Sequence, residues 1–149
     1  MSIETWKQEF YPVSAKEVEK EKAAEHSLRK WEGARKENLE KHGLERATTT
    51  TSSIRCVGDH LGDRFYFDGV SCSLCVHFYK QGDGWDAGCE DCPLCIVRGG
   101  VPCTGTAEGE RVSPYDKSVS TGNPEPMISA LKLAVEWQEK QRKESRENG

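Results

Sequence analysis

The residues of this chain whose type and spacing predict chemistry are its cysteines. The 149-residue chain has seven, and three pairs of them are separated by only two residues: Cys72/Cys75, Cys89/Cys92 and Cys92/Cys95. A Cys-x2-Cys pair lets one tight turn direct two thiolates at the same ion, so two such turns can complete a tetrahedral metal site. The seven cysteines are Cys56, Cys72, Cys75, Cys89, Cys92, Cys95 and Cys103.

The spacing Cys72-x2-Cys75-x13-Cys89-x2-Cys92 predicts a four-thiolate Zn²⁺ site of the zinc-ribbon type, with these four cysteines as ligands. The second pair stays open, because Cys92 is shared by two overlapping motifs and Cys92/Cys95 fits the spacing as well. Short strands and glycine-rich loops bury too little apolar surface to offset the entropy of ordering them. We therefore expect the ion to stabilise this segment.

The residues around the thiols support other interpretations less well. Unliganded thiols stay open as an alternative. A redox pair would need a thioredoxin-like βαβ pattern, which neither motif has around it. Cys89-x2-Cys92-x2-Cys95 is similar to the first three ligands of a bacterial ferredoxin, but the next cysteine is Cys103, where that pattern needs one three residues on. Cys56-x3-His60 suggests a second metal site, to which Cys95, Cys103 and His77 are further candidates.

No catalytic template matches the chain well. The sequence has neither the His-Glu-x2-His of a metalloprotease nor the His-x-Glu of a zinc deaminase. Asp59-His60 is similar to the water-activating histidine of a ββα-metal nuclease, but that histidine lies between two Cys-x2-Cys pairs, whereas His60 precedes both. Four thiolates also leave the ion no open position for water. This arrangement predicts a structural site in a protein that is not an enzyme.

Composition sets further bounds. The chain is 35% hydrophobic and 31% charged, and its 21 Lys and Arg against 25 Asp and Glu give a net charge of −4. An acidic balance argues against sequence-independent binding of nucleic acid, which usually needs a basic surface. No run approaches the roughly 18 apolar residues of a membrane span. The odd cysteine count and the absence of an apolar leader at the start predict a cytoplasmic location.

Three segments should position the cysteines. Residues 1–47 form a helical N-terminal segment. Ser14-Ala15-Lys16-Glu17 fits a capping box, which predicts a helix start there. The spacing of Ala24, Leu28 and Trp31 gives that helix an apolar face. Gly33 should end or bend it, and a shorter helix around Leu39 should end before Gly43.

The cysteine-rich module spans residues 54–121, after a threonine-rich stretch at 47–53 that reads as a linker or an edge strand. Phe65 and Phe67 alternate with polar residues and predict a strand ending at Asp68-Gly69, and Val76 and Phe78 predict a second one. The last segment, 123–145, is a helix that begins with Asn123 as its cap. Met127, Ala130, Leu131, Ala134 and Gln138 share one face of it, and the polar tail after Lys140 is expected to fray.

Two stretches resemble small proteins of tailed bacteriophages that carry a CxxC…CxxCP zinc-ribbon-like motif. One stretch runs from Glu25 to Leu44. The other has Cys72-Ser73-Leu74-Cys75, Cys89-Glu90-Asp91-Cys92-Pro93-Leu94, Cys103, Ser113-Pro114-Tyr115 and the helix from Met127. The resemblance implies an accessory factor that is stabilised by a metal ion and acts on a host or defence protein. It does not identify an enzymatic activity for this chain. It adds Cys103 to the candidate ligands, whereas Cys95 is a departure of this chain from the pattern.

The sequence thus predicts an α+β protein, with a zinc-ribbon-like β module between N-terminal helices and a C-terminal helix. We expect a zinc-binding, non-enzymatic interaction protein with a host protein as partner. Exposed aromatic residues around the ribbon, Tyr66, Tyr79 and Trp85, would supply contacts. Binding of nucleic acid through the ribbon is the first alternative, and a metal-dependent nuclease is the second. The basic residues available for nucleic acid are Arg64, Lys80, Arg98 and Arg111.

Overall fold

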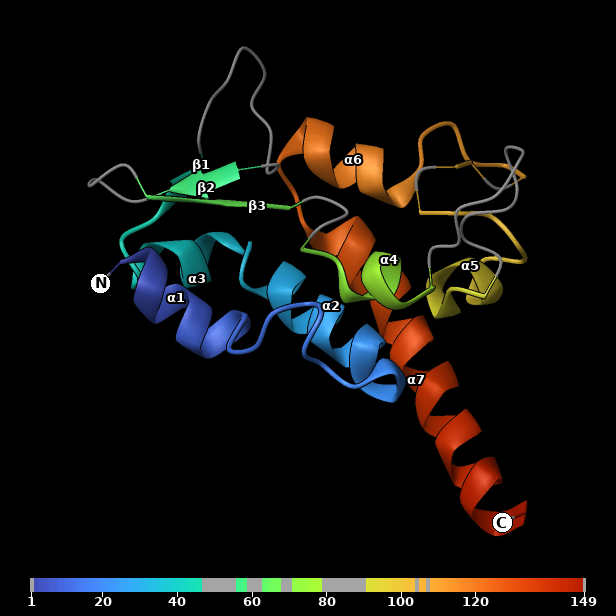
Figure 1. Ribbon diagram of the computed structural model, residues 1–149. Helices are drawn as coiled ribbons and strands as arrows, with labels where there is room; N and C mark the ends of the chain where they lie inside the picture. Colours follow the sequence, from blue (N-terminus) through green and yellow to red (C-terminus); the bar gives the residue numbers. More distant parts are fainter. Residues whose placement is uncertain are drawn as a thin grey trace.

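The computed structural model combines seven α-helices and a short 3-10 helix with a small antiparallel sheet in the parts of the chain that it describes (Figure 1), which confirms the α+β class. The described residues are 2–46, 56–58, 63–67, 71–78, 91–103, 105–106 and 108–148. The elements are α1 (Ile3–Phe10), η1 (Lys20–Lys22), α2 (Ala23–Glu32), α3 (Lys36–Lys41), β1 (Glu45–Arg46), β2 (Cys56–Gly58), β3 (Arg64–Tyr66), α4 (Ser73–Phe78), α5 (Pro93–Val97), α6 (Pro114–Thr121) and α7 (Glu125–Asn148).

Helix α1 begins with a capping box that is closed on both sides. The Ser2 hydroxyl accepts from the Thr5 amide at 3.3 Å, and the Thr5 hydroxyl accepts from the Ser2 amide at 3.0 Å. Ile3, Trp6 and Phe10 lie on its buried face. Trp6 donates from Nε1 to the carbonyl oxygen of Gly33 at 2.9 Å, so α1 and the end of α2 are joined inside the core.

Helix α2 begins later than the capping box at Ser14 predicts, so that prediction is wrong. Residues 14–18 make a single turn, held by local hydrogen bonds: the Glu17 amide donates to the Ser14 carbonyl oxygen at 3.0 Å, and the Ala15 amide donates to the Tyr11 hydroxyl at 3.0 Å. The start of α2 is capped from α7 instead. Gln138 accepts from the Ala24 amide at 3.0 Å through Oε1 and donates to the Lys20 carbonyl oxygen at 3.1 Å through Nε2.

The ends of α2 and α3 agree with the sequence. Helix α2 ends at Glu32 with Gly33 as its C-cap. Leu39 is the buried residue of α3, and Gly43 follows that helix with φ at +69°, a conformation that glycine adopts without a steric penalty.

The sheet has the order β1-β2-β3, with both pairings antiparallel. Val57 on β2 faces Phe65 on β3, which confirms the strand predicted around Phe65. Phe65 and Phe67 then join an aromatic core, where Phe65 lies 4.9 Å from Trp6 and Phe67 lies 5.1 Å from Trp31 between ring centroids. The sheet is thereby fixed to α1 and α2.

Helix α7 packs along α2, α5 and α6 and so connects the N-terminal helices with the cysteine-rich part of the chain (Figure 1). The Glu125 amide donates to Oδ1 of Asn123 at 3.1 Å, as expected of a cap at Asn123. Met127, Leu131, Ala134 and Gln138 are buried, which confirms the predicted face. The expected fraying after Lys140 is wrong, because the helix continues to Asn148.

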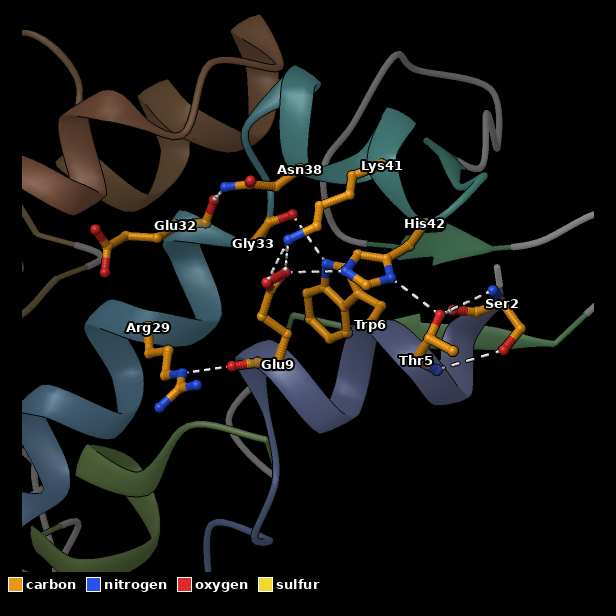
Figure 2. Close-up of polar contacts among 10 residues, drawn as sticks. All are labelled: Ser2, Thr5, Trp6, Glu9, Arg29, Glu32, Gly33, Asn38, Lys41 and His42. Carbon is orange, nitrogen blue, oxygen red and sulfur yellow. Dashed lines mark hydrogen bonds and ion pairs between the residues drawn. The ribbon is translucent and has the colours of Figure 1, made fainter.

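Polar side chains between α1 and α3 form a closed network (Figure 2). Glu9 receives Lys41 Nζ at 2.7 Å and His42 Nε2 at 3.0 Å. The other ring nitrogen of His42 lies 2.9 Å from the Thr5 hydroxyl. Arg29 donates to the Glu9 carbonyl oxygen, so each of these groups has a partner.

Several predicted features lie outside the described residues, among them the threonine-rich linker, the turn at Asp68-Gly69, and the side chains of Cys56, His60, Tyr79, Lys80, Trp85 and Cys89. In the part of the chain that the structure covers, none of the helices combines the length and the apolar character needed to cross a membrane.

Candidate metal centre

The first cysteine pair lies at the start of a helix, not in a strand. The Val76 amide donates to the Cys72 carbonyl oxygen at 2.9 Å and opens α4 directly after Cys72. The strand predicted around Val76 and Phe78 is therefore wrong. Leu74 is buried, and Phe78, four residues later, packs against the core. This spacing is that of a helix, and it outweighs the alternation of Val76 and Phe78 that suggested a strand.

Two serines connect this helix to α2. Ser73 is fully buried and donates to the Ala23 carbonyl oxygen at 2.6 Å, and its oxygen lies 3.0 Å from the Ser27 hydroxyl. Ser27 in turn lies 3.6 Å from the Cys72 sulfur. The small side chains let α4 approach α2 closely, so the position of Cys72 is fixed by contacts far away in sequence.

The two thiols of the pair differ in their electrostatics. The pKa of Cys72 is lowered well below its ordinary value, because it accepts a hydrogen bond from the Cys75 thiol. Although burial opposes this shift, the charge of Lys30, the Cys75 amide and the Ser27 hydroxyl all support it. Lys30 is itself buried, and its Nζ lies 3.3 Å from the Ser71 carbonyl oxygen and 3.2 Å from the Ser71 hydroxyl.

The pKa of Cys75 is raised, first because its thiol donates to Cys72 and next because it is buried. Negative charge on Cys72, Cys103 and Cys92 raises it further. The lowered pKa of Cys72 favours its thiolate, the form that binds metal, and an ion bound to both sulfurs would displace the proton of Cys75.

The second pair also begins a helix. Cys92 is the N-cap of α5, with Pro93 at the first helical position, and the Ile96 amide donates to the Cys92 carbonyl oxygen at 2.9 Å. Cys95 is 3% exposed and belongs to the hydrophobic core. Cys103 is half-buried and connects to α6, since its carbonyl oxygen accepts from the Tyr115 amide at 3.3 Å.

Of the four predicted ligands, Cys72 and Cys75 lie at the start of α4 and Cys92 is the N-cap of α5. Cys89, the remaining predicted ligand, lies outside the described residues. Among the residues that are described, no group of three or more His, Cys, Asp or Glu side chains is arranged to hold a metal ion. The four-thiolate site stays a prediction.

Sequence reasoning did not identify the surroundings of Cys72 on α2. His26 and Lys30 lie on that helix and both interact electrostatically with Cys72. The pKa of His26 is lowered, chiefly by burial. The local signal for this cluster was weak: His26 and Lys30 lie about one helical turn apart, on either side of Ser27. Nothing in the sequence connects Ser27 on α2 to Cys72, which lies 45 positions away.

Comparison of the chain with protein-family models, with curated proteins and with solved structures gives no match.

Proposed function

We propose that this chain is a zinc-binding, non-enzymatic interaction protein that acts in the cytoplasm, with Zn²⁺ held by Cys72, Cys75, Cys92 and one further thiolate. The observation that carries the proposal is the Cys72–Cys75 pair. The pair lies at the start of α4, where the Ser27 hydroxyl is 3.6 Å from the Cys72 sulfur, and the lowered pKa of Cys72 favours the thiolate, the form that binds metal.

The fourth ligand is Cys89, from the predicted zinc-ribbon spacing, or Cys103, whose charge acts on Cys75. The proposed centre is zinc-ribbon-like in its ligands. It differs from a simple ribbon because α4 begins at Ser73, inside the first cysteine pair, and α5 begins at Pro93, directly after Cys92. The ion would join these helices to the loop that leads into α6, where local burial alone is small.

Metal analysis of the full chain tests this proposal. We expect one Zn²⁺ per chain in the reduced protein. Cys72→Ser, Cys75→Ser and Cys92→Ser should each lose it, and so should one of Cys89→Ser and Cys103→Ser. Cys56→Ser is the matched control and should retain the ion. A reduced protein that contains no zinc or iron, and that still unfolds cooperatively after treatment with a chelator, would contradict the proposal.

A zinc ion held by four thiolates stabilises the fold and does not catalyse a reaction, because no coordination position is left for water or substrate. The surface offers contacts for a partner protein: Tyr66 on β3 is 54% exposed. We expect a host protein as the partner if the chain is encoded by a phage. Capture from a bacterial lysate by the zinc-loaded chain, compared with capture by Tyr66→Ala and by the zinc-free chain, tests this role.

Nucleic acid is the alternative partner, and Arg98, a candidate basic residue for it, is engaged within the chain. Arg98 donates to the Gly105 carbonyl oxygen at 2.9 Å and pairs with Glu110 at 2.6 Å. A gel-shift experiment over a range of salt concentrations separates the two kinds of partner. Affinity for DNA or RNA that falls steeply with salt would favour phosphate contacts over a protein partner. Nicking of DNA with Mg²⁺, Mn²⁺ or Ni²⁺ would instead favour the nuclease.

A further inference from the structure

Two of the three histidines in the described part of the chain have an unsatisfied ring nitrogen. His42 has oxygen partners at both nitrogens, Thr5 at 2.9 Å and Glu9 at 3.0 Å. In contrast, Nδ1 of His26 and Nε2 of His77 are buried and have no hydrogen-bond partner. A buried polar atom without a partner destabilises the folded state, and native proteins rarely carry one without a reason.

The hydrogen bond of His26 determines which nitrogen is free to bind. Its Nε2 lies 2.7 Å from the Val13 carbonyl oxygen, which can only accept, so the proton is on Nε2. Nδ1 therefore carries a bare lone pair. The His26 ring is 8% exposed and packs against Tyr11 with ring centroids 4.9 Å apart, which fixes its direction. Metal-binding histidines usually have this pattern, with one nitrogen donating to a carbonyl group and the other directed at the ion.

His77 approaches from the neighbouring helix. It lies on α4, which packs against α2 through the contact of Ser73 with Ala23, and it interacts electrostatically with His26. Two charged groups also act on His26: Lys30, which disfavours a cation there, and Cys72, which favours one as a thiolate. Lys30 is turned toward Ser71 and toward the rings of Trp31 and Phe67, so part of its charge is already satisfied.

We propose that His26 Nδ1 and His77 Nε2 together bind a divalent metal ion that prefers imidazole, such as zinc, nickel, cobalt or copper, at a site between α2 and α4. Its donors are imidazole nitrogens instead of thiolates, although His77 follows Cys75 by two residues on α4. Two imidazoles fill two coordination positions. Because no third donor among the described residues is arranged to join them, water fills the others. A single buried water molecule is the competing way to satisfy the same two nitrogens.

The test uses the full chain, first loaded with one equivalent of Zn²⁺. Ni²⁺ is then titrated into it, and calorimetry measures the binding. We expect one Ni²⁺ site in the wild type. His26→Gln and His77→Gln should each weaken it by at least tenfold. His42→Gln, a buried histidine whose nitrogens are both satisfied, is the matched control and should bind Ni²⁺ as the wild type does. If the chain holds no Zn²⁺ at its thiols, the titration is carried out on the metal-free protein, so failure of the proposed function does not decide this result.

A second readout covers the case in which His26→Gln does not fold. His77 lies at a half-buried position, and far-UV circular dichroism should show that His77→Gln keeps its helices. In the wild type, NMR of the imidazole ¹⁵N nuclei should show that added Zn²⁺ or Ni²⁺ perturbs His26 and His77 and leaves His42 unchanged. Absence of a Ni²⁺ site in the wild type, unchanged binding in either variant, or identical responses of all three rings would overturn the paired site and favour water.

Discussion

The polar groups between α1 and α3 and those between α2 and α4 differ in how completely they are satisfied. At the first junction, Glu9, Lys41 and His42 share one another as partners, and Thr5 completes the network (Figure 2). At the second, His26 and His77 each keep a buried nitrogen without a hydrogen bond. The first junction is complete as a folded structure. The second has groups that suit a ligand.

The charges differ in the same way. Glu9 and Lys41 lie partly in water, with side chains 31% and 60% exposed, where an ion pair contributes little. Lys30 is buried and Cys72 is half-buried, so their charges interact more strongly, because water screens them less. An interior arrangement of this kind is costly unless it serves binding, and this is why the α2–α4 junction is the place where function should be sought.

The largest effect expected from this comparison is that of zinc. At free Zn²⁺ concentrations about a thousand times the dissociation constant, the free energy of unfolding should rise by about 4 kcal/mol. Hydrogen exchange should slow most in α4 and α5 and least in α1. Cys72→Ser should abolish the gain and Cys56→Ser should keep it. Equal slowing in both variants would show that the ion acts elsewhere.

The next effect tests packing at the α1 side. Gly33 has ordinary helical φ and ψ angles, but a Cβ atom there would lie 2.7 Å from ring atoms of Trp6 and Phe10. Gly33→Ala should therefore lower the free energy of unfolding by roughly 1–3 kcal/mol through overpacking. Gly109→Ala, at a φ of +86° with open space around it, measures the backbone penalty alone, about 1 kcal/mol. Urea unfolding of both variants gives the comparison, and an unaffected Gly33→Ala would show that α1 can move away.

A smaller effect is expected for the cap that α7 provides to α2. Gln138→Ala leaves the Ala24 amide without its acceptor and should cost about 1 kcal/mol. Gln141→Ala, at an exposed position on the same helix, should change stability by less than about 0.5 kcal/mol. Thermal unfolding of both variants separates a cap from a general effect on α7. Identical melting temperatures would mean that water replaces Gln138.

The smallest effect is a pH dependence at Glu9. Lys41 and His42 lower the pKa of Glu9 through hydrogen bonds, so its ionised form favours the folded state. That stabilisation is fully present above the unfolded pKa of about 4.3 and is lost as the pH falls through the lower folded value. The difference in stability between the wild type and Glu9→Gln should therefore shrink on acidification and at high salt. Glu17→Gln, at an exposed turn, should show no such trend, and a pH-independent difference for Glu9→Gln would rule out the charge as its cause.

Much of the fold could be predicted where local patterns agree with burial. Ala24 and Trp31 mark the buried face of α2, and Gly33 ends that helix as expected. The start of α2 could not be predicted, because its cap is supplied by Gln138, more than a hundred residues away. Helix α1 did carry a local signal in its Ser2–Thr5 capping box. The alternation at Val76 and Phe78 was misleading, because a run of so few residues fits both the two-residue period of a strand and the 3.6-residue period of a helix.

The candidate site divides along the same line. By itself, the sequence determined that Cys72 and Cys75 lie about one turn apart, since only two residues separate them. That the two bind the same ion stays a prediction. Only the tertiary structure decided that α4 packs against α2, that the pKa of Cys72 is lowered, and that His26 Nδ1 and His77 Nε2 are buried without a hydrogen-bond partner. Ionisation and hydrogen bonding depend on burial and on which groups meet in space, and α2, α4 and α7 are brought together by contacts that no local pattern encodes.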